Sequence, residues 1–110
     1  MAAAQTPAGQ RPQRCPAAHP EDPAPCGGPV AVTVSDASGA GVDGCEHHAA
    51  RMLASLDGAR VTPLPDGPPG AAVRVFTAAD RTRPFCWVED APRTTAAQLS
   101  RAENRKRDGH

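Results

Sequence analysis

The chain has 110 residues, with 12 basic and 12 acidic side chains, so its formal net charge is zero. Ala supplies 22 residues and Pro plus Gly another 23, whereas Val, Leu, Met, Phe and Trp together supply only 17. This length allows one small domain, and so few large apolar side chains exclude a large enzyme core. The composition also excludes a transmembrane protein and a strongly electrostatic nucleic-acid binder.

The first 25 residues contain six prolines and no Val, Leu, Ile or Phe. Nothing there offsets the entropy of ordering, so residues 1–25 are predicted to be disordered unless Cys15 or His19 is held by another part of the chain. The segment does not read as a secretory signal, and a cytoplasmic location is expected. In a reducing compartment, four cysteines favour free thiols or metal ligands over a disulfide framework.

A small α+β domain is predicted over residues 26–90, in the order strand, helix, hairpin. Its first strand is indicated by Val30, Val32 and Val34, which alternate with smaller residues as in a half-buried strand. Residues 36–41 are expected to form a loop, because they are small, polar and rich in Gly.

A helix of about 14 residues is predicted next, because Asp43 and Glu46 have the spacing of a capping box. Gly58 suits the position that follows a helix C-terminus. At 100° per residue, one face of this helix gathers the residues expected to cover the valine face of the sheet. They are Cys45, His48, Ala49, Met52, Leu53 and Leu56.

The rest of the domain is predicted to be extended. Residues 59–64 read as a short strand that Pro63 confines to an edge or to its own end. Residues 71–77 read as the second strand of a hairpin with a wide loop, and residues 85–90 as a last short strand. Residues 91–110 form a polar, basic tail that is helical by propensity but has no apolar stripe to bury.

The residues with the clearest chemistry are Cys26, Cys45 and His48. Cys26 precedes a Gly-Gly-Pro turn, and the spacing to Cys45 is close to that between the two halves of a zinc site. Cys45 lies at the predicted helix start, where the helix N-terminus lowers the pKa of a thiol. The three-residue offset puts Cys45 and His48 on one side of the helix, and it turns His47 to solvent.

A tetrahedral zinc site needs a fourth ligand, for which Cys15, His19 and Cys86 are candidates. Cys15 is preferred, because a thiolate holds Zn²⁺ more firmly than a neutral imidazole. The predicted metal ligands are therefore Cys15, Cys26, Cys45 and His48, with Zn²⁺ in a structural role. The alternative is that these side chains pack in the core without metal, as free cysteines often do.

A Cys-Gly turn, a strand, and Cys45-x2-His48 at the start of a helix resemble treble-clef and zinc-ribbon proteins. The resemblance implies a structural metal and no particular activity. The segments GCEHHAARMLASLDGARV and RPFCWVEDAPRT also resemble small uncharacterised proteins of GC-rich actinobacteria. That second resemblance covers roughly residues 26–93 and implies nothing about function.

The function predicted from these residues is a non-enzymatic interaction module, stabilised by zinc, that binds a protein partner and no membrane. One alternative is a nucleic-acid-associated regulator that uses the basic C-terminal tail. Another is a thiol redox sensor centred on Cys45, with His48 as its base. Trp87, with Phe85, is expected to plug the core over the sheet, and its alternative role is an exposed anchor for a partner.

Overall fold

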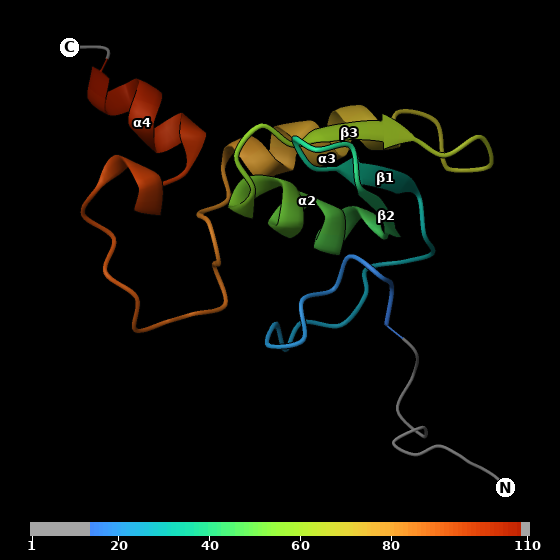
Figure 1. Ribbon diagram of the computed structural model, residues 1–110, viewed down its shortest axis with the longest axis horizontal. Helices are drawn as coiled ribbons and strands as arrows, with labels where there is room; N and C mark the ends of the chain where they lie inside the picture. Colours follow the sequence, from blue (N-terminus) through green and yellow to red (C-terminus); the bar gives the residue numbers. More distant parts are fainter. Residues whose placement is uncertain (1–13, 109–110) are drawn as a thin grey trace, which may run out of the picture.

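The alternating valines form the central strand of a three-stranded antiparallel sheet. The computed structural model describes residues 14–108, and its sheet has the order β2-β1-β3. The strands are β1 (Val32–Ser35), β2 (Gly41–Gly44) and β3 (Arg60–Pro63). Val32 and Val34 of β1 are fully buried on one face of the sheet, which two helices cover (Figure 1). The predicted α+β class is confirmed.

The hairpin of this fold precedes the first helix. β1 pairs with β2 through a short loop closed by Asp36, whose carboxylate accepts hydrogen bonds from the N–H groups of Ser38 and Ala40. The predicted loop over residues 36–41 is therefore one residue too long, since β2 begins at Gly41. The alternation rule misses β2 because Gly41 and Gly44 leave it with a single apolar side chain.

The predicted helix corresponds to α2 (Glu46–Ser55), which is shorter than predicted and begins later. Asp43 does not cap it, because Asp43 belongs to β2 and its carboxylate accepts a hydrogen bond from Thr33. Cys45 is the N-cap instead. The predicted inner face is confirmed in part: Leu53 is buried, and Met52 and Leu56 pack at the edge of the same apolar core. Ala50 and Ala54, which lie outside the predicted face, are buried as well.

The second helix, α3 (Ala71–Asp80), replaces the predicted strand over residues 71–77. The alternation of Val73 and Val75 suggested a strand, but Val73 is 70% exposed. The buried residues are Ala71, Val75 and Ala79, which recur every four residues and face α2. Ala has the highest helix propensity, so local preference and packing both favour the helix. The predicted hairpin after α2 is therefore wrong. β3 is an edge strand that pairs with β1 and ends at Pro63.

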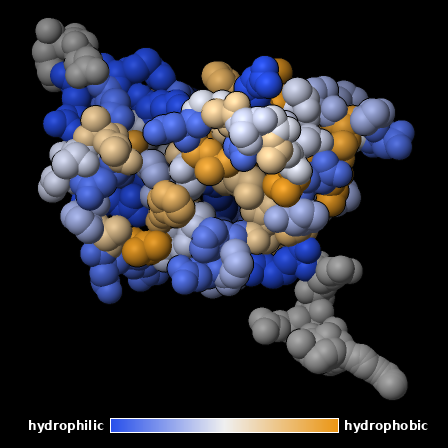
Figure 2. Space-filling view, in the orientation of Figure 1, coloured by the Kyte–Doolittle hydropathy of each residue, from blue (hydrophilic) through white to orange (hydrophobic). Residues whose placement is uncertain are grey.

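The chain after α3 contains turns where a last strand was predicted over residues 85–90. A 3-10 turn, η2 (Ala96–Gln98), leads to the helix α4 (Arg101–Asp108). The tail is therefore helical as its propensity suggests, and polar contacts dock it on the body. Arg105 pairs with Asp80 at the end of α3, 2.7 Å between Nη1 and Oδ1, and Glu103 pairs with Arg83. Figure 2 shows the hydrophilic surface of this end of the molecule.

The segment before β1 belongs to the folded part as well. Residues 14–25 were predicted to be disordered unless Cys15 or His19 was held, and Cys15 is held, with only 9% of its surface exposed. Ala17 is buried too, and its N–H donates to the carbonyl of Asp43 in β2, 3.1 Å away. The remainder of the predicted disordered segment, residues 1–13, lies outside the described residues, as do residues 109–110.

Candidate metal centre

The loop over residues 14–26 passes across the N-terminus of α2, and this brings the four predicted ligands together. Cys15 and Cys26 come from the loop, and Cys45 and His48 come from the start of α2. One donor atom of each side chain lies within 4.8 Å of the other three. The cluster is composed of one imidazole and three thiols, all of them free cysteines.

The two other candidates for the fourth ligand are not in the cluster. His19 stacks on Trp87 instead, with the ring centroids 4.8 Å apart. Cys86 lies in the turn that carries Trp87. Among the described residues, Cys15 is therefore the fourth member of the cluster, in line with the chemical preference for a thiolate.

Three of the separations between donor atoms match those of a tetrahedron around a zinc ion. Bonds of 2.3 Å to sulfur and about 2.0 Å to nitrogen place two sulfurs about 3.8 Å apart, and a sulfur and a nitrogen about 3.6 Å apart. The sulfurs of Cys15 and Cys45 are 3.9 Å apart. The Nδ1 atom of His48 lies 3.6 Å from the sulfur of Cys15 and 3.3 Å from that of Cys45. The donors are therefore spaced to share one ion.

His48 is 1% exposed, and its two ring nitrogens have separate partners. Nδ1 faces the sulfurs, while Nε2 lies 2.9 Å from the carbonyl oxygen of Ala24. The Arg14 guanidinium lies 3.4 Å from the same nitrogen. The carbonyl of Ala24 is closer and only accepts, so it favours a proton on Nε2, which leaves the lone pair of Nδ1 for a metal. The predicted register is also correct for its neighbour, because His47 is exposed.

Cys45 has two roles at the start of α2. Its sulfur accepts a hydrogen bond from the N–H of His48, 3.3 Å away, and this caps the helix. Burial alone would raise the pKa of the Cys45 thiol, but the backbone N–H groups of His48 and Gly27 donate to the sulfur and hold the pKa below its usual value. Burial raises the pKa of the Cys15 thiol. Of these two thiols, Cys45 therefore loses its proton more readily than Cys15.

A buried ion pair holds the ligand loop against α2. Asp22 is 1% exposed, and its carboxylate accepts hydrogen bonds from Arg51 at 2.6 and 3.0 Å and from the N–H of Ala24 at 3.0 Å. Burial would raise the pKa of Asp22, but the donors from Arg51 and Ala24 keep it below its usual value. Sequence reasoning missed this pair, since an acid in a Pro-rich segment and an Arg on a helix form no pattern.

Close packing against β2 fixes the same loop. A Cβ atom added to Gly44 would lie 2.4 Å from the Cβ of Ala17, which is closer than side-chain carbons approach in proteins. The Gly at this position therefore leaves room for the segment that carries Cys15. The sequence shows a Gly directly before Cys45, but no pattern in it indicates that Ala17 packs against this Gly.

The fold and the site define a small α+β protein with a Cys₃His cluster. Comparisons with protein-family models, curated proteins and solved structures find no match to this chain. No helix among residues 14–108 is long and apolar enough to span a membrane.

Proposed function

We propose that this protein is a non-enzymatic interaction module in which Cys15, Cys26, Cys45 and His48 hold a structural Zn²⁺. The observation that carries the proposal is the mutual approach of four donor atoms, all within 4.8 Å. Three thiolates and one imidazole in a tetrahedral arrangement are a ligand set typical of zinc. The ligands come from both ends of a loop and from a helix, so the ion would crosslink these segments.

A structural role is favoured over a catalytic one by the number of protein ligands. Catalytic zinc sites keep one position open for water or substrate, whereas structural sites are closed by four side chains. Here four side chains are available, and Cys45 and His48 are almost fully buried. We infer that the ion contributes stability that the few large apolar side chains of this chain do not provide. A reducing compartment such as the cytoplasm suits this role, because it keeps the thiols free to bind metal.

The nucleic-acid alternative is less well supported, because basic side chains of the tail make internal contacts. Arg105 pairs with Asp80, and Arg101 lies within 3.5 Å of the carbonyl oxygens of Leu53 and Leu56. The redox alternative needs an accessible thiol at Cys45, which is 0% exposed. The internal contacts of the tail arginines therefore argue against nucleic-acid binding, and the burial of Cys45 argues against a redox sensor centred on this residue.

Metal content tests the proposal directly. The protein, purified without chelator, is expected to carry one zinc ion per chain by native mass spectrometry and elemental analysis. Replacement by Co²⁺ is expected to give the visible absorption of a tetrahedral thiolate complex. Chelation should lower the unfolding temperature, because metal binding is coupled to folding.

Variants separate the predicted ligands from the other thiol. Cys26→Ser should lose the zinc ion, whereas Cys86→Ser should keep it. A chain that binds no zinc at micromolar concentration, and whose stability does not change with chelator, would contradict the proposal. So would loss of zinc from Cys86→Ser with retention by Cys26→Ser.

A further inference from the structure

The four side chains of the metal centre differ in how far solvent reaches them. Cys45 and His48 are 0% and 1% exposed, and Cys15 is 9% exposed. Cys26, at the end of the ligand loop, is only partly buried. A small oxidant that diffuses in from solvent therefore meets the sulfur of Cys26 before the other two sulfurs of the cluster.

Cys26 has a second thiol directly beside it. The backbone N–H of Cys15 donates to the Cys26 sulfur over 3.3 Å, and the two sulfurs lie within 4.8 Å of each other. The sulfurs of a disulfide are about 2.05 Å apart, so the bond needs a movement of only about 2–3 Å. Zinc binds thiolates, and two sulfurs joined in a disulfide are no longer thiolates. Disulfide formation at this position is therefore incompatible with zinc binding.

We propose that hydrogen peroxide oxidises Cys26, that a disulfide then links Cys26 to Cys15, and that the zinc ion leaves. This inference concerns the regulation of the metal centre, so it rests on the proposed zinc site. It differs from the redox alternative above, because the residue that reacts first is Cys26, which solvent reaches, and not Cys45, which is buried.

The reaction has two steps. In the first, the Cys26 thiolate attacks one oxygen of hydrogen peroxide, the O–O bond breaks, hydroxide leaves, and Cys26 becomes a sulfenic acid. In the second, the Cys15 thiolate attacks the Cys26 sulfur, the S–S bond forms, the S–O bond breaks, and a second hydroxide leaves. Two electrons pass from the two sulfurs to the peroxide, and two protons from solvent convert both hydroxides to water.

Cys15 is a more suitable partner for Cys26 than Cys45 is. The Cys45 sulfur is held in place as the cap of α2, where it accepts the N–H of His48. Cys15 lies on the same loop as Cys26, and its own N–H already contacts the Cys26 sulfur. The choice of partner decides what happens to the loop. Zinc would tie the loop to Cys45 and His48 of α2, whereas a disulfide between Cys15 and Cys26 closes the loop on itself.

Oxidation should therefore loosen the contact between the ligand loop and α2. Without the ion, the loop retains weaker links to the helix, such as the pair between Asp22 and Arg51. We expect the loop to dock less firmly, because the energy of metal binding no longer holds it. A partner that contacts the docked loop would then bind the zinc-loaded protein and lose affinity after oxidation.

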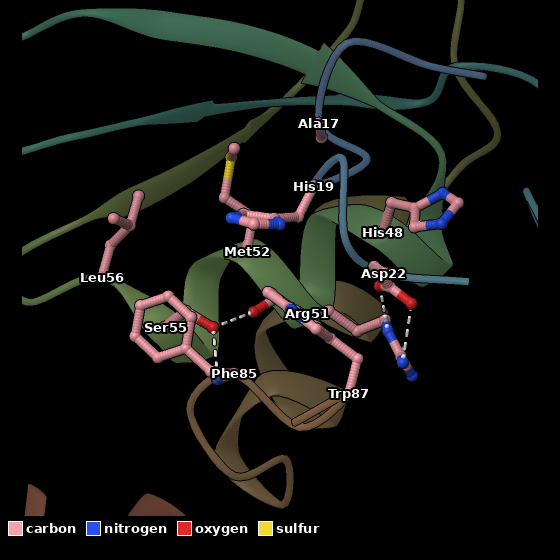
Figure 3. A pocket seen from close by; sticks show the side chains of 10 residues that line it. All are labelled: Ala17, His19, Asp22, His48, Arg51, Met52, Ser55, Leu56, Phe85 and Trp87. Carbon is pink, nitrogen blue, oxygen red and sulfur yellow. Dashed lines mark hydrogen bonds and ion pairs between the residues drawn. The ribbon is translucent and has the colours of Figure 1, made fainter. Parts of the chain in front are cut away.

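Trp87 lies where it can report on the position of the loop. The ring of His19, from the loop, stacks on the indole with the centroids 4.8 Å apart and the planes 30° apart (Figure 3). The guanidinium of Arg51, from α2, lies 6.0 Å from the same ring while it is bound to Asp22. Trp87 therefore packs against the ligand loop and α2, not over the sheet as the sequence predicted. Movement of the loop would change the surroundings of this indole, the only one in the chain.

The test treats the zinc-loaded full chain with hydrogen peroxide and measures zinc release with a colorimetric chelator. We expect one zinc ion to be released for each disulfide formed, with Cys15 and Cys26 as the linked pair in peptide mass spectrometry. The fluorescence of Trp87 should change in step with zinc release, and dithiothreitol with added zinc should reverse both changes. Retention of zinc in excess peroxide would overturn the proposal, and so would a disulfide that includes Cys45.

Variants distinguish Cys26 from the other partly buried thiol. Cys26→His keeps four ligands for zinc but removes the thiol that the oxidant reaches first, so peroxide should release its zinc at least about tenfold more slowly than in the parent chain. Cys86→Ser is the matched control, because Cys86 is also partly exposed but lies outside the cluster, and its release rate should be unchanged. Release from Cys26→His at the parent rate would overturn the role of Cys26.

A second measurement does not depend on zinc binding by a variant. In the zinc-loaded parent protein, N-ethylmaleimide should label Cys26 before Cys15 and Cys45, as followed by peptide mass spectrometry. Earlier labelling of either buried thiol would contradict the proposal. A chain that binds no zinc would contradict the metal centre and this inference with it, whereas a chain that binds zinc and retains it in peroxide would contradict the oxidation alone.

Discussion

The Nε2 atom of His48 lies 2.9 Å from the carbonyl oxygen of Ala24 and connects the start of α2 to the loop that supplies the other ligands. This contact favours a proton on Nε2, so Nδ1 presents its lone pair to the sulfurs of Cys15 and Cys45. Ala24 is one of several loop residues that contact the start of α2, among them Arg14 and Cys15. Another, Asp22, is bound to Arg51 one helical turn further along α2. The contacts that orient the His48 imidazole therefore also hold the loop against α2.

Substitution of the two adjacent histidines should have opposite results. His48→Ala removes a ligand and the bond to Ala24, so zinc affinity should fall by at least the roughly 10–100-fold typical for loss of an outer partner. Zinc titration against a competing chelator, with circular dichroism to follow folding, measures both effects. His47→Ala is the matched control: His47 is exposed on the same helical turn, and both properties should stay unchanged. Loss of zinc in His47→Ala would show that the helical register is wrong.

The contact between Gly44 and Ala17 predicts that a single methyl group displaces the ligand loop. Gly44→Ala would place two Cβ atoms 2.4 Å apart, and overpacking of this kind costs about 1–3 kcal/mol. Denaturant unfolding of the zinc-loaded protein measures the loss. Ala17→Gly removes the opposing methyl group, so the double variant should regain most of the stability. If the second substitution gives no rescue, the clash is not the cause.

The sequence was sufficient for those parts of the protein that depend on local chemistry. The ligand quartet followed from the spacing of Cys45 and His48, from the turn at Cys26, and from the preference of zinc for a further thiolate. The central strand and the inner face of α2 followed from apolar periodicity. The strand and the helix face are each encoded within a few residues, whereas the quartet spans residues 15–48 and was predicted from the chemistry of its side chains.

The features that were not predicted depend on packing between segments that are far apart in the sequence. Val73 and Val75 alternate like strand residues, and only the packing of Val75 against α2 shows that residues 71–80 form a helix. The Asp22–Arg51 pair joins residues 29 positions apart, and its members carry no motif. The positive φ of Phe85 contradicts local preference and is maintained by Ser55, a residue 30 positions away. Unlike the metal-ligating cysteines and histidine, these residues have no distinctive chemistry that would indicate a contact over such a separation.

The docking of α4 should depend on the charge of Glu103. Arg83, together with the N–H and hydroxyl of Ser100, lowers the pKa of Glu103 to about 2. A pKa that is lower in the folded state stabilises the fold above the ordinary Glu pKa, and this contribution is lost as pH falls from about 4.5 toward 2. Glu103→Gln should therefore unfold at lower denaturant than the parent protein at pH 6, and the difference should shrink below pH 4.

The control for this pH effect is Glu89→Gln, which changes an exposed carboxylate with no ion pair among residues 14–108. Both variants would lose a bound metal in acid as the parent protein would, so only the difference between them reports on Glu103. A constant difference from pH 6 to pH 3 would contradict the assignment.

Arg93 should organise the turn that carries Trp87. Its guanidinium donates to the carbonyl oxygens of Pro84 at 2.6 Å, Phe85 at 3.0 Å and Gln98 at 3.2 Å. A Lys cannot reproduce this planar fork, so Arg93→Lys should destabilise the turn by about 1–2 kcal/mol. The fluorescence of the single Trp should shift toward that of a solvated indole. Arg81→Lys, at an exposed position, should leave the emission unchanged, and a similar shift there would refute the role of Arg93.

The strain at Phe85 is measurable by comparing two substitutions that both remove the ring. At φ 50 a Gly is relaxed, whereas an Ala retains the clash of its Cβ with the backbone. Phe85→Gly should therefore be more stable than Phe85→Ala by about 1 kcal/mol, although Gly loses more backbone entropy on folding. Val88 is the control, because its φ is not positive. There, Val88→Ala should be more stable than Val88→Gly. If Ala is preferred at both positions, Phe85 is not strained.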